Sequence, residues 1–262
     1  MKDSQLNVYN FRRMRKQPAE AYEFIRFDPN NDCNVHCVYC HNPRSKDTVP
    51  TEELQSFLDE NVESIQNFQM GCIMEPTLDR RLADLFLLIG QSKTRPQKRF
   101  ILQTNAILLH MHDHAKFREA GLNEVSVSID AADAATHKRL RGGTSISKVG
   151  GNIANFRKAC PAVKVVFITT VNRINIGVMD NLVQFGRDLG VETFYLREVF
   201  HHPESKVVDH SRMLDLVLAP GEFRRFAQDM IARIGGQAHL ILSSKDDLEQ
   251  FDSRIRAASF RS

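Results

Sequence analysis

Hydrophobic and polar positions follow two patterns that alternate along the chain. From residue 22 to about residue 200, short runs rich in β-branched and aromatic residues alternate with longer stretches whose apolar residues recur every three or four positions. The first pattern predicts buried strands and the second predicts amphipathic helices. The predicted strands are residues 23–27, 69–74, 99–103, 124–129, 163–171 and 192–197.

The stretches between these strands carry helix signals. Thr51 begins the first predicted helix, which has acidic residues in its first turn and an apolar stripe at Leu54, Phe57, Leu58, Val62 and Ile65. The other predicted helices are residues 79–89, 112–120, two short stretches within 132–159, and about 178–189. Glycines at positions 90, 121 and 190 are the predicted C-terminal stops of three of them.

The last quarter of the chain is less regular. A polar loop with His201, His202 and His210 follows the sixth strand. A helix is predicted from about Gly221, with one apolar face made of Phe223, Phe226, Met230, Ile231 and Ile234. A seventh strand at 238–242 and a terminal helix at 246–258 complete the predicted elements.

Strands joined by crossover helices must be parallel, and each such connection is right-handed. The chain is therefore predicted to be α/β, a partial (β/α)6 TIM-like barrel of parallel strands with a C-terminal helical and strand extension. No linker or repeat divides it, so we expect one folded domain. The predicted boundaries are an N-terminal extension at 1–21, the barrel at 22–218, and a C-terminal extension at 219–262 packed on the same domain.

Composition narrows the classes of function. The chain has 262 residues, 42% of them hydrophobic, and a net charge of +3. This charge is too small to indicate a nucleic-acid partner, and no apolar run is long enough for a membrane span. The polar, charged first twenty residues do not resemble a signal peptide. We therefore expect a cytoplasmic protein, in which thiols stay reduced and a cysteine cluster indicates metal binding.

Three of the five cysteines lie within eight residues, at Cys33, Cys37 and Cys40. A four-iron cluster normally takes four cysteines, so three thiolates leave one iron open to a substrate or cofactor. The alternative is a zinc site completed by His36 or His41, although zinc sites usually draw ligands from two separated pairs. The remaining cysteines, Cys72 and Cys160, are isolated in the sequence.

Polar residues follow the predicted strands at the edge where chemistry takes place in a parallel barrel. The cysteine loop leaves the first strand, and the later strands end near Glu75, Thr104, Asn105, Asp130, Asn172 and Arg197. Each of these residues has an alternative role as a turn residue or helix cap. Together they indicate a small-molecule site.

The motifs, in this order, resemble those of radical S-adenosylmethionine (SAM) enzymes over roughly residues 22–200. The family's cysteine motif matches Cys33, Cys37 and Cys40, with the aromatic Tyr39 before the last cysteine. The segments that resemble Gly-Gly-Glu-Pro, Thr-Asn-Gly, Ser-Ile-Asp and His-x-x-x-Arg-Gly are residues 73–76, 104–106, 128–130 and 137–142. The similarity is greatest to members with a twitch or SPASM extension.

This resemblance implies two cofactors, a [4Fe–4S] cluster held by the three cysteines and SAM, which chelates the fourth iron. Glu75 would bind the SAM ammonium, and Arg141 and Ser128 would bind its carboxylate. Asn105 and Asp130 are also implied to bind SAM. Asn172 would contact its ribose or methionyl group. Tyr39 and the segment around Tyr195 and Leu196 would cover its adenine. An external one-electron reductant of the flavodoxin or ferredoxin type would reduce the cluster. A 5′-deoxyadenosyl radical would then abstract hydrogen from the substrate.

Two departures from the family pattern affect this interpretation. Ile73 and Met74 replace the paired glycines before Glu75, with Gly71 and Cys72 just upstream. No cysteine follows Cys160, so the auxiliary clusters of extended members are not expected. A single cluster favours a redox-neutral rearrangement, elimination, epimerisation or hydrogen-return reaction, or a reaction that consumes SAM and uses an outside electron partner.

The substrate is predicted to be a small molecule such as a nucleoside or sugar. A peptide is less favoured, because only about thirty residues precede the cysteine loop, too few for a separate recognition domain. The alternative function is a non-catalytic zinc or iron–sulfur protein with a degenerate SAM site, against which the retained polar residues argue. No catalytic residue is identified. Cys72 is a candidate hydrogen-atom donor, but a small buried strand cysteine is the favoured explanation of this residue.

Overall fold

The computed structural model describes residues 2–6, 22–61, 65, 67–91 and 99–244. Contacts divide the chain into two compact units that are each discontinuous in sequence. The first unit comprises Met1–Val35, Asn42–Ser128 and Ser147–Val165. The second comprises His36–His41, Ile129–Ile146 and Val166–Ser262. The cysteine motif is therefore shared, with Cys33 in the first unit and Cys37 and Cys40 in the second.

The first unit contains parallel strands in chain order. They are β1 (Lys2–Leu6), β2 (Tyr22–Phe27), β3 (Asn67–Met70), β4 (Arg99–Thr104) and β5 (Glu124–Ser128). Ile25 of β2 pairs with Phe68 of β3, which pairs in turn with Phe100 of β4. These three side chains are almost wholly buried and belong to the core of the unit. The register therefore aligns apolar residues across the strands, as burial of a parallel sheet requires.

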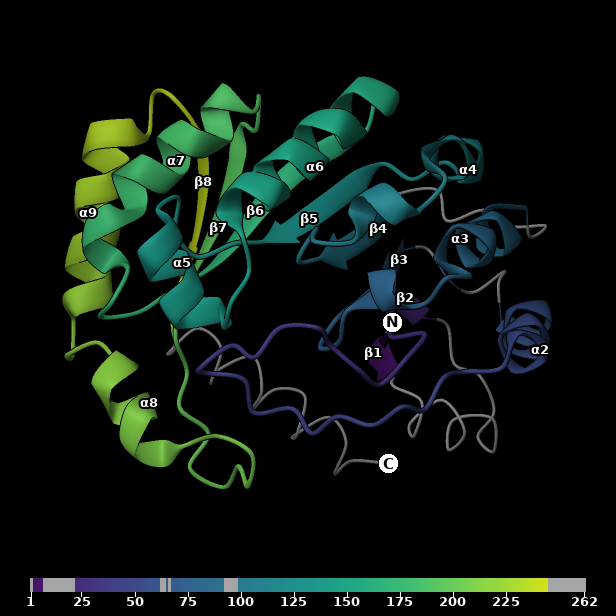
Figure 1. Cartoon of the computed structure of the whole chain (residues 1–262), viewed down its shortest axis with the longest axis horizontal. Helices are drawn as coiled ribbons and strands as arrows, with labels where there is room; N and C mark the ends of the chain where they lie inside the picture. The colour runs from purple at the N-terminus through teal and green to yellow at the C-terminus, as the bar shows by residue number, and fades with distance from the viewer. Residues whose placement is uncertain (1, 7–21, 62–64, 66, 92–98, 245–262) are drawn as a thin grey trace. The chain divides into compact units, whose positions relative to one another are not determined.

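The helices of this unit bury the apolar stripes that the sequence predicts. They are α2 (Thr51–Asn61), α3 (Leu82–Gln91), α4 (His114–Ala120) and α6 (Ile146–Ala159), the last from Ser147 onward, with short 3₁₀ turns η2 (Pro76–Leu78) and η3 (Leu109–Met111). Helices α3 and α4 pack side by side (Figure 1). Phe86 of α3 stacks edge-on against Phe117 of α4 with ring centroids 5.3 Å apart.

The second unit continues the alternation of strands and helices. Its strands are β6 (Lys164–Val171), from Val166 onward, β7 (Thr193–Glu198) and β8 (His239–Ser243), again parallel and in chain order. Its helices are α5 (Ala134–Arg141), α7 (Met179–Asp188), α8 (His210–Leu216) and α9 (Glu222–Ile234), with the 3₁₀ turn η4 (Ile176–Val178) before α7. Buried Leu140, Val199, Met213 and Leu216 form a cluster to which Val38 and Tyr39 of the cysteine loop add.

Each of the seven predicted strands has a counterpart, but several details of the prediction were wrong. The strand predicted at 69–74 ends at Met70, because Gly71 adopts a left-handed φ of 83°. Cys72 therefore lies in a loop rather than in a strand. Gly90 does not end its helix, which continues to Gln91. A Cβ on Gly90 would lie 2.4 Å from the carbonyl oxygen of Ala120, so this glycine permits the close packing of α3 and α4.

Two elements were not predicted, β1 and α8. In α9, Ile231 is 56% exposed, although the sequence pattern assigned it to the apolar face. The predicted terminal helix at 246–258 and Val62 lie outside the described residues. No helix in the described part of the chain is long and apolar enough to cross a membrane. The proposed domain boundaries remain predictions.

Candidate active site

The cysteine loop is held by the end of α5 in the second unit. The N–H of Val38 donates to the carbonyl of Leu140 over 2.9 Å, and the N–H of Cys40 donates to the carbonyl of Cys37 over 3.0 Å. Gly142, which caps α5 with φ 69°, brings the backbone close to this loop. A Cβ on Gly142 would lie 2.7 Å from the carbonyl oxygen of His36. Only glycine therefore allows this approach.

Three cysteine thiols are the type of donor that an iron–sulfur cluster takes. Cys33, Cys37 and Cys40 are each half-buried, and Arg44 Nη1 donates to the carbonyl of Cys33 over 2.9 Å. Burial raises the pKa of the Cys37 thiol, while the positive charge of Arg141 lowers it. Iron binding requires the thiolate form, so cluster assembly would release protons. In the described residues no three His, Cys, Asp or Glu side chains converge as a metal-ion site.

The two histidines of the zinc alternative flank Cys37 and Cys40. The ring of His41 stacks on that of His202, with centroids 3.9 Å apart, and His202 also packs edge-on against Phe200. Burial lowers the pKa of His41. Ser205 Oγ donates to the carbonyl of His41 over 3.5 Å. His202 and Ser205 of the loop after β7 thus contact the cysteine loop, whereas Pro203, Glu204, Lys206 and Val207 of the same loop are exposed.

Glu75 is the buried carboxylate of the first unit. Its Oε1 accepts hydrogen bonds from Thr77 N at 3.1 Å, Thr77 Oγ1 at 2.5 Å and Thr104 Oγ1 at 2.6 Å. Its Oε2 accepts from the N–H of Asn105 at 2.7 Å. Burial raises the pKa of Glu75, and these hydrogen bonds lower it. The side chain is fixed in one orientation, so it is preorganised to receive a cation at Oε2.

The turn after β4 links Glu75 to the cysteine loop. Asn105 Nδ2 donates to Asn34 Oδ1 over 2.7 Å, next to Cys33. The following residue, Ala106, is wholly buried and has φ 60°, a left-handed conformation that favours glycine. Asn152 of α6 stabilises the turn, because its Nδ2 donates to the carbonyls of Ala106 at 2.8 Å and Ile107 at 2.9 Å.

Asp130 and Arg141 form a buried ion pair in the second unit. Arg141 Nε lies 2.8 Å from Asp130 Oδ2, and the hydroxyl of Tyr39 donates to the same oxygen. The other oxygen, Oδ1, accepts from the N–H of Thr170 at 2.9 Å. Asn175 Nδ2 donates to the carbonyl of Asp130 over 2.9 Å. Asp130 thereby connects the cysteine loop, α5 and the end of β6.

Burial and the Asp130–Arg141 ion pair shift the pKa values of neighbouring groups in the second unit. Burial opposes the charge of Arg141, but Asp130, Tyr39 and Cys37 raise its pKa well above the ordinary value. Burial also raises the pKa of Tyr39 well above its usual range, so the phenol stays protonated as a donor. Among the described residues, Arg141 donates hydrogen bonds from Nε alone.

The remaining predicted SAM-binding residues lie in three different settings. Ser128 is the half-buried last residue of β5. Asn172 is wholly buried, and its amide shapes the turn after β6 by donating to the carbonyl of Thr170 and accepting from the N–H of Ile174. Leu196 is wholly buried within β7, whereas its neighbour Tyr195 is half-buried. A role for Tyr195 over an adenine ring therefore requires less rearrangement than one for Leu196.

Sequence reasoning missed the residues that hold this site together. Asp28, Asn152 and Asn175 are buried, and each hydrogen-bonds to the backbone of a segment that carries a predicted site residue. Asp28 and Asn175 are polar residues shortly after a strand, which is the available signal, whereas Asn152 lies within α6. The partners of all three are distant in sequence. His137, also buried, has no hydrogen bond to either ring nitrogen among the described residues.

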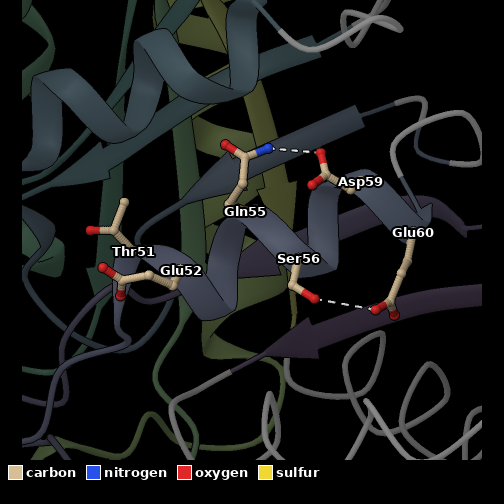
Figure 2. A pocket seen from close by; sticks show the side chains of 6 residues that line it. All are labelled: Thr51, Glu52, Gln55, Ser56, Asp59 and Glu60. Atoms are coloured by element: carbon tan, nitrogen blue, oxygen red, sulfur yellow. Dashed lines mark hydrogen bonds between the residues drawn. The ribbon is translucent and has the colours of Figure 1, made fainter.

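A shallow surface hollow lies along the outer face of α2. Figure 2 shows its lining, in which Gln55 Nε2 donates to Asp59 Oδ1 over 2.8 Å and Ser56 Oγ donates to Glu60 Oε1 over 3.3 Å. These contacts join residues four apart on one helix. None of the candidate cofactor residues lines the hollow, so it belongs to the solvated face of the helix.

The sequence also matches the family model described as the radical SAM superfamily, over residues 28–186. This range is more than half of the chain, and the chain belongs to that superfamily. Radical SAM enzymes bind a [4Fe–4S] cluster and SAM, so the chain is an enzyme of this class with these two cofactors. Its thiols, buried carboxylate and buried guanidinium suit them.

Curated relatives carry more specific names. A probable GTP 3′,8-cyclase of Sulfurisphaera tokodaii is 30% identical over 190 residues, which cover 71% of this chain and 58% of the relative. An AdoMet-dependent heme synthase of Methanosarcina barkeri is 28% identical over 196 residues, covering 68% of this chain and 51% of the relative. The chain thus spans between half and two thirds of the length of these proteins.

Solved structures confirm the fold class. Streptococcus suis SuiB bound to S-adenosylmethionine gives a TM-score of 0.69 at 13% identity, covering 89% of this chain and 53% of SuiB. Native anSMEcpe with bound AdoMet and Cp18Cys peptide gives a TM-score of 0.63 at 17% identity, covering 83% of this chain and 62% of that chain. The fold is α/β, the partial TIM-like barrel of parallel strands that the sequence predicts.

Proposed function

We propose that this enzyme reductively cleaves SAM and uses the resulting radical to abstract hydrogen from a small-molecule substrate. When bound, the [4Fe–4S] cluster would supply one electron to SAM, and SAM would be the source of methionine and a 5′-deoxyadenosyl radical. That radical takes a hydrogen atom from the substrate and becomes 5′-deoxyadenosine.

In this proposal Cys33, Cys37 and Cys40 hold the cluster. Glu75 binds the ammonium of SAM, and Arg141 with Ser128 binds its carboxylate. The observation that carries the proposal is the state of the two charged side chains. Glu75 and Arg141 are each buried and fixed by hydrogen bonds, and among the described residues Arg141 donates from Nε alone. Opposite charges of this kind suit the two ends of an amino acid.

The other predicted SAM contacts have supporting roles in the proposal. Asn105 and Asp130 orient Glu75 and Arg141, respectively. Tyr39, Tyr195 and Leu196 belong to segments that would cover the adenine, and Asn172 shapes the turn that would face the ribose. Cys72 remains a candidate hydrogen donor, half-buried and three residues before Glu75.

SAM cleavage can be tested directly. The protein is reconstituted with iron and sulfide under anaerobic conditions, reduced with dithionite and incubated with SAM, and 5′-deoxyadenosine and methionine are quantified by chromatography. We expect equimolar formation of both, abolished in Cys37→Ala. A protein that contains four irons but forms no 5′-deoxyadenosine would disprove the proposal.

For the substrate class we favour a nucleoside or nucleotide over a sugar or peptide. The support is that several curated relatives are named GTP 3′,8-cyclases. The experiment compares GTP, the other nucleoside triphosphates, nucleotide sugars and a peptide mixture, with each substrate deuterated. Transfer of deuterium from a nucleotide into 5′-deoxyadenosine is expected. Transfer from a peptide alone would contradict this choice.

We further propose that the enzyme works in the cytoplasm with an external one-electron donor of the flavodoxin or ferredoxin type, without a membrane or nucleic-acid partner. The thiols of Cys37 and Cys40 support this setting, since such thiols persist in a reducing compartment. A single cluster suits a redox-neutral reaction. Four further irons in a fully reconstituted sample would contradict the single-cluster proposal.

A further inference from the structure

Asp28, which directly follows β2, makes unusual contacts for a buried carboxylate. It is wholly buried, and its Oδ1 accepts hydrogen bonds from the N–H groups of Cys72 at 2.8 Å and Met74 at 3.3 Å. Its Oδ2 accepts from the N–H of Ile73 at 3.3 Å. One side chain thus binds three successive backbone N–H groups, the segment that leads to Glu75.

Gly71 makes this arrangement possible. Its φ of 83° ends β3 and turns the chain, and its N–H donates to the carbonyl of Phe27 over 2.8 Å. A Cβ at this position would lie 2.2 Å from the carbonyl oxygen of Gln103. No side chain fits there, so the path of residues 72–74 depends on glycine at position 71.

The loop before Cys33 continues the same contact. The carbonyl of Asp32 accepts the N–H of Glu75 over 3.0 Å, and Asn30 Nδ2 donates to the carbonyl of Glu75 over 3.0 Å. Four consecutive N–H groups, at residues 72–75, are therefore bound by the loop that leads into the cysteine motif. We call Asp28, Asn30 and the carbonyl of Asp32 the loop clamp.

The loop clamp binds the N–H groups of residues 72–75 and not the carbonyl oxygens of Ile73 and Met74. No described residue donates to the carbonyl oxygens of Ile73 or Met74. These carbonyls and Glu75 Oε2 are acceptors on adjacent residues, a set that suits a ligand ammonium with several N–H donors. The backbone adopts this path although neither Ile73 nor Met74 is a glycine.

We propose that Asp28 is a positioning residue for SAM, which fixes residues 72–75 through the loop clamp so that Glu75 and the preceding carbonyls receive the SAM ammonium. This inference rests on the proposed function, because it assigns SAM to Glu75. It adds that the affinity for SAM depends on a side chain that does not itself touch the cofactor. It also links the cysteine loop and the Glu75 segment as one hydrogen-bonded structure.

The test is the substitution Asp28→Asn, which keeps the shape but replaces one acceptor oxygen with an N–H₂ group. At least one of the three backbone N–H groups then loses its acceptor. Each such loss corresponds to about a tenfold effect. Phe117→Leu is the control, since it perturbs the core of the same unit and none of the clamp contacts.

Two measurements are made on each variant. Amide hydrogen exchange of the cofactor-free protein should be about tenfold or more faster at residues 72–74 in Asp28→Asn, and unchanged there in Phe117→Leu. The SAM concentration that half-saturates the change in the reduced-cluster electron paramagnetic resonance signal should rise about tenfold in Asp28→Asn only. Iron content should equal that of the wild type in both variants.

The outcomes separate the two proposals. If the wild-type signal does not respond to SAM, the proposed function fails. If the wild type responds and a folded Asp28→Asn protein binds SAM with the same affinity, the positioning role is wrong. Loss of iron in Asp28→Asn would also overturn it, because Asp28 would then serve the cysteine loop. If Asp28→Asn does not fold, Asn30→Ala removes a second clamp contact, and unchanged SAM affinity in that variant overturns the inference.

Discussion

Arg141 donates from Nε to Oδ2 of Asp130 over 2.8 Å, and both side chains are buried. This ion pair lies in the unit that contains Cys37 and Cys40, and Tyr39 of the cysteine loop donates to the same carboxylate oxygen. A guanidinium held in this way keeps its charge and its orientation before any ligand arrives. Preorganisation of this kind lowers the cost of ordering a side chain on binding.

Removing the charge of Asp130 should therefore destabilise the protein. Asp130→Asn leaves a buried guanidinium without its counter-ion, a change that typically costs about 3–5 kcal/mol. The free energy of unfolding from urea titrations would measure it, with Asp209→Asn, at an exposed helix cap, as the control. The double variant Asp130→Asn/Arg141→Met should recover part of the loss. If the loss in the double variant equals the sum of the losses in Asp130→Asn and Arg141→Met, the two side chains are not energetically coupled.

The strained turn after β4 gives a second prediction. Ala106 has φ 60° and is buried, and a non-glycine residue in this region costs about 1–3 kcal/mol. Ala106→Gly should relieve this strain and, after the entropy cost of glycine, raise the free energy of unfolding by about 1 kcal/mol. Asn152→Ala should lower it, because two buried carbonyls lose their donor. Asn152→Ala should lower the free energy of unfolding less in the Ala106→Gly variant than in the wild type. Equal losses in both proteins would show that Asn152 does not stabilise the strained turn at Ala106.

The pKa of Asp28 predicts a pH dependence of stability. Burial raises this pKa from its ordinary value of 3.8 to about 6, with a further increase from the charge of Glu75 and a decrease from the three backbone N–H groups. The folded state therefore binds a proton more tightly than the unfolded state. The stabilisation is fully present below about pH 4 and is lost as the pH rises through about 6.

The magnitude of this effect is about 3 kcal/mol across that range. It is measured as the difference in unfolding free energy between the wild type and Asp28→Asn from pH 7.5 down to pH 4.5. We expect the difference to shift in favour of the wild type as the pH falls. A difference that does not change with pH would show that Asp28 titrates at its ordinary value.

The cysteines give a prediction about iron. Replacing Cys33, Cys37 or Cys40 with alanine should each abolish the bound cluster, since a [4Fe–4S] centre with only two protein thiolates is not retained. Cys72→Ala and Cys160→Ala should keep four irons per chain. Iron and sulfide analysis after anaerobic reconstitution measures this. Iron retained in Cys40→Ala and lost in Cys72→Ala would mean that the ligand assignment is wrong.

Much of the fold could be predicted from the sequence because its elements have strong local signals. The β-branched run ending at Val171 is present as predicted, and Leu54, Phe57 and Leu58 of the predicted stripe are buried in α2. The helix ends at Asn61, so Ile65 lies beyond it. Helix α8 was missed because it is short and has only three apolar residues beside one histidine and two charged residues, although Asp209 caps it and Met213 and Leu216 have helical spacing. Strand β1 is short and polar, so its pairing with β2 depends on tertiary context.

The site was less predictable, because its essential contacts join residues far apart in sequence. The sequence identifies Glu75, Asp130 and Arg141 as candidates, but the pairing of Arg141 with Asp130 requires the geometry of α5. Asp28 contacts residues 44 to 46 positions away, and only the turn at Gly71 brings them together. From the sequence, the replacement of the family's paired glycines by Ile73 and Met74 therefore suggested a disturbed SAM site. In the structure, the backbone of these two residues is held by hydrogen bonds to Asp28.

The most direct test of the account is electron paramagnetic resonance of the anaerobically reconstituted, dithionite-reduced protein, recorded with and without SAM. We expect a reduced [4Fe–4S] signal that changes shape when SAM is added, because SAM would bind the iron that lacks a cysteine ligand. A cluster signal that is unaffected by saturating SAM would contradict it. The same is true if no cluster forms after careful reconstitution, and the alternative of a non-catalytic metal-binding protein would then be preferred.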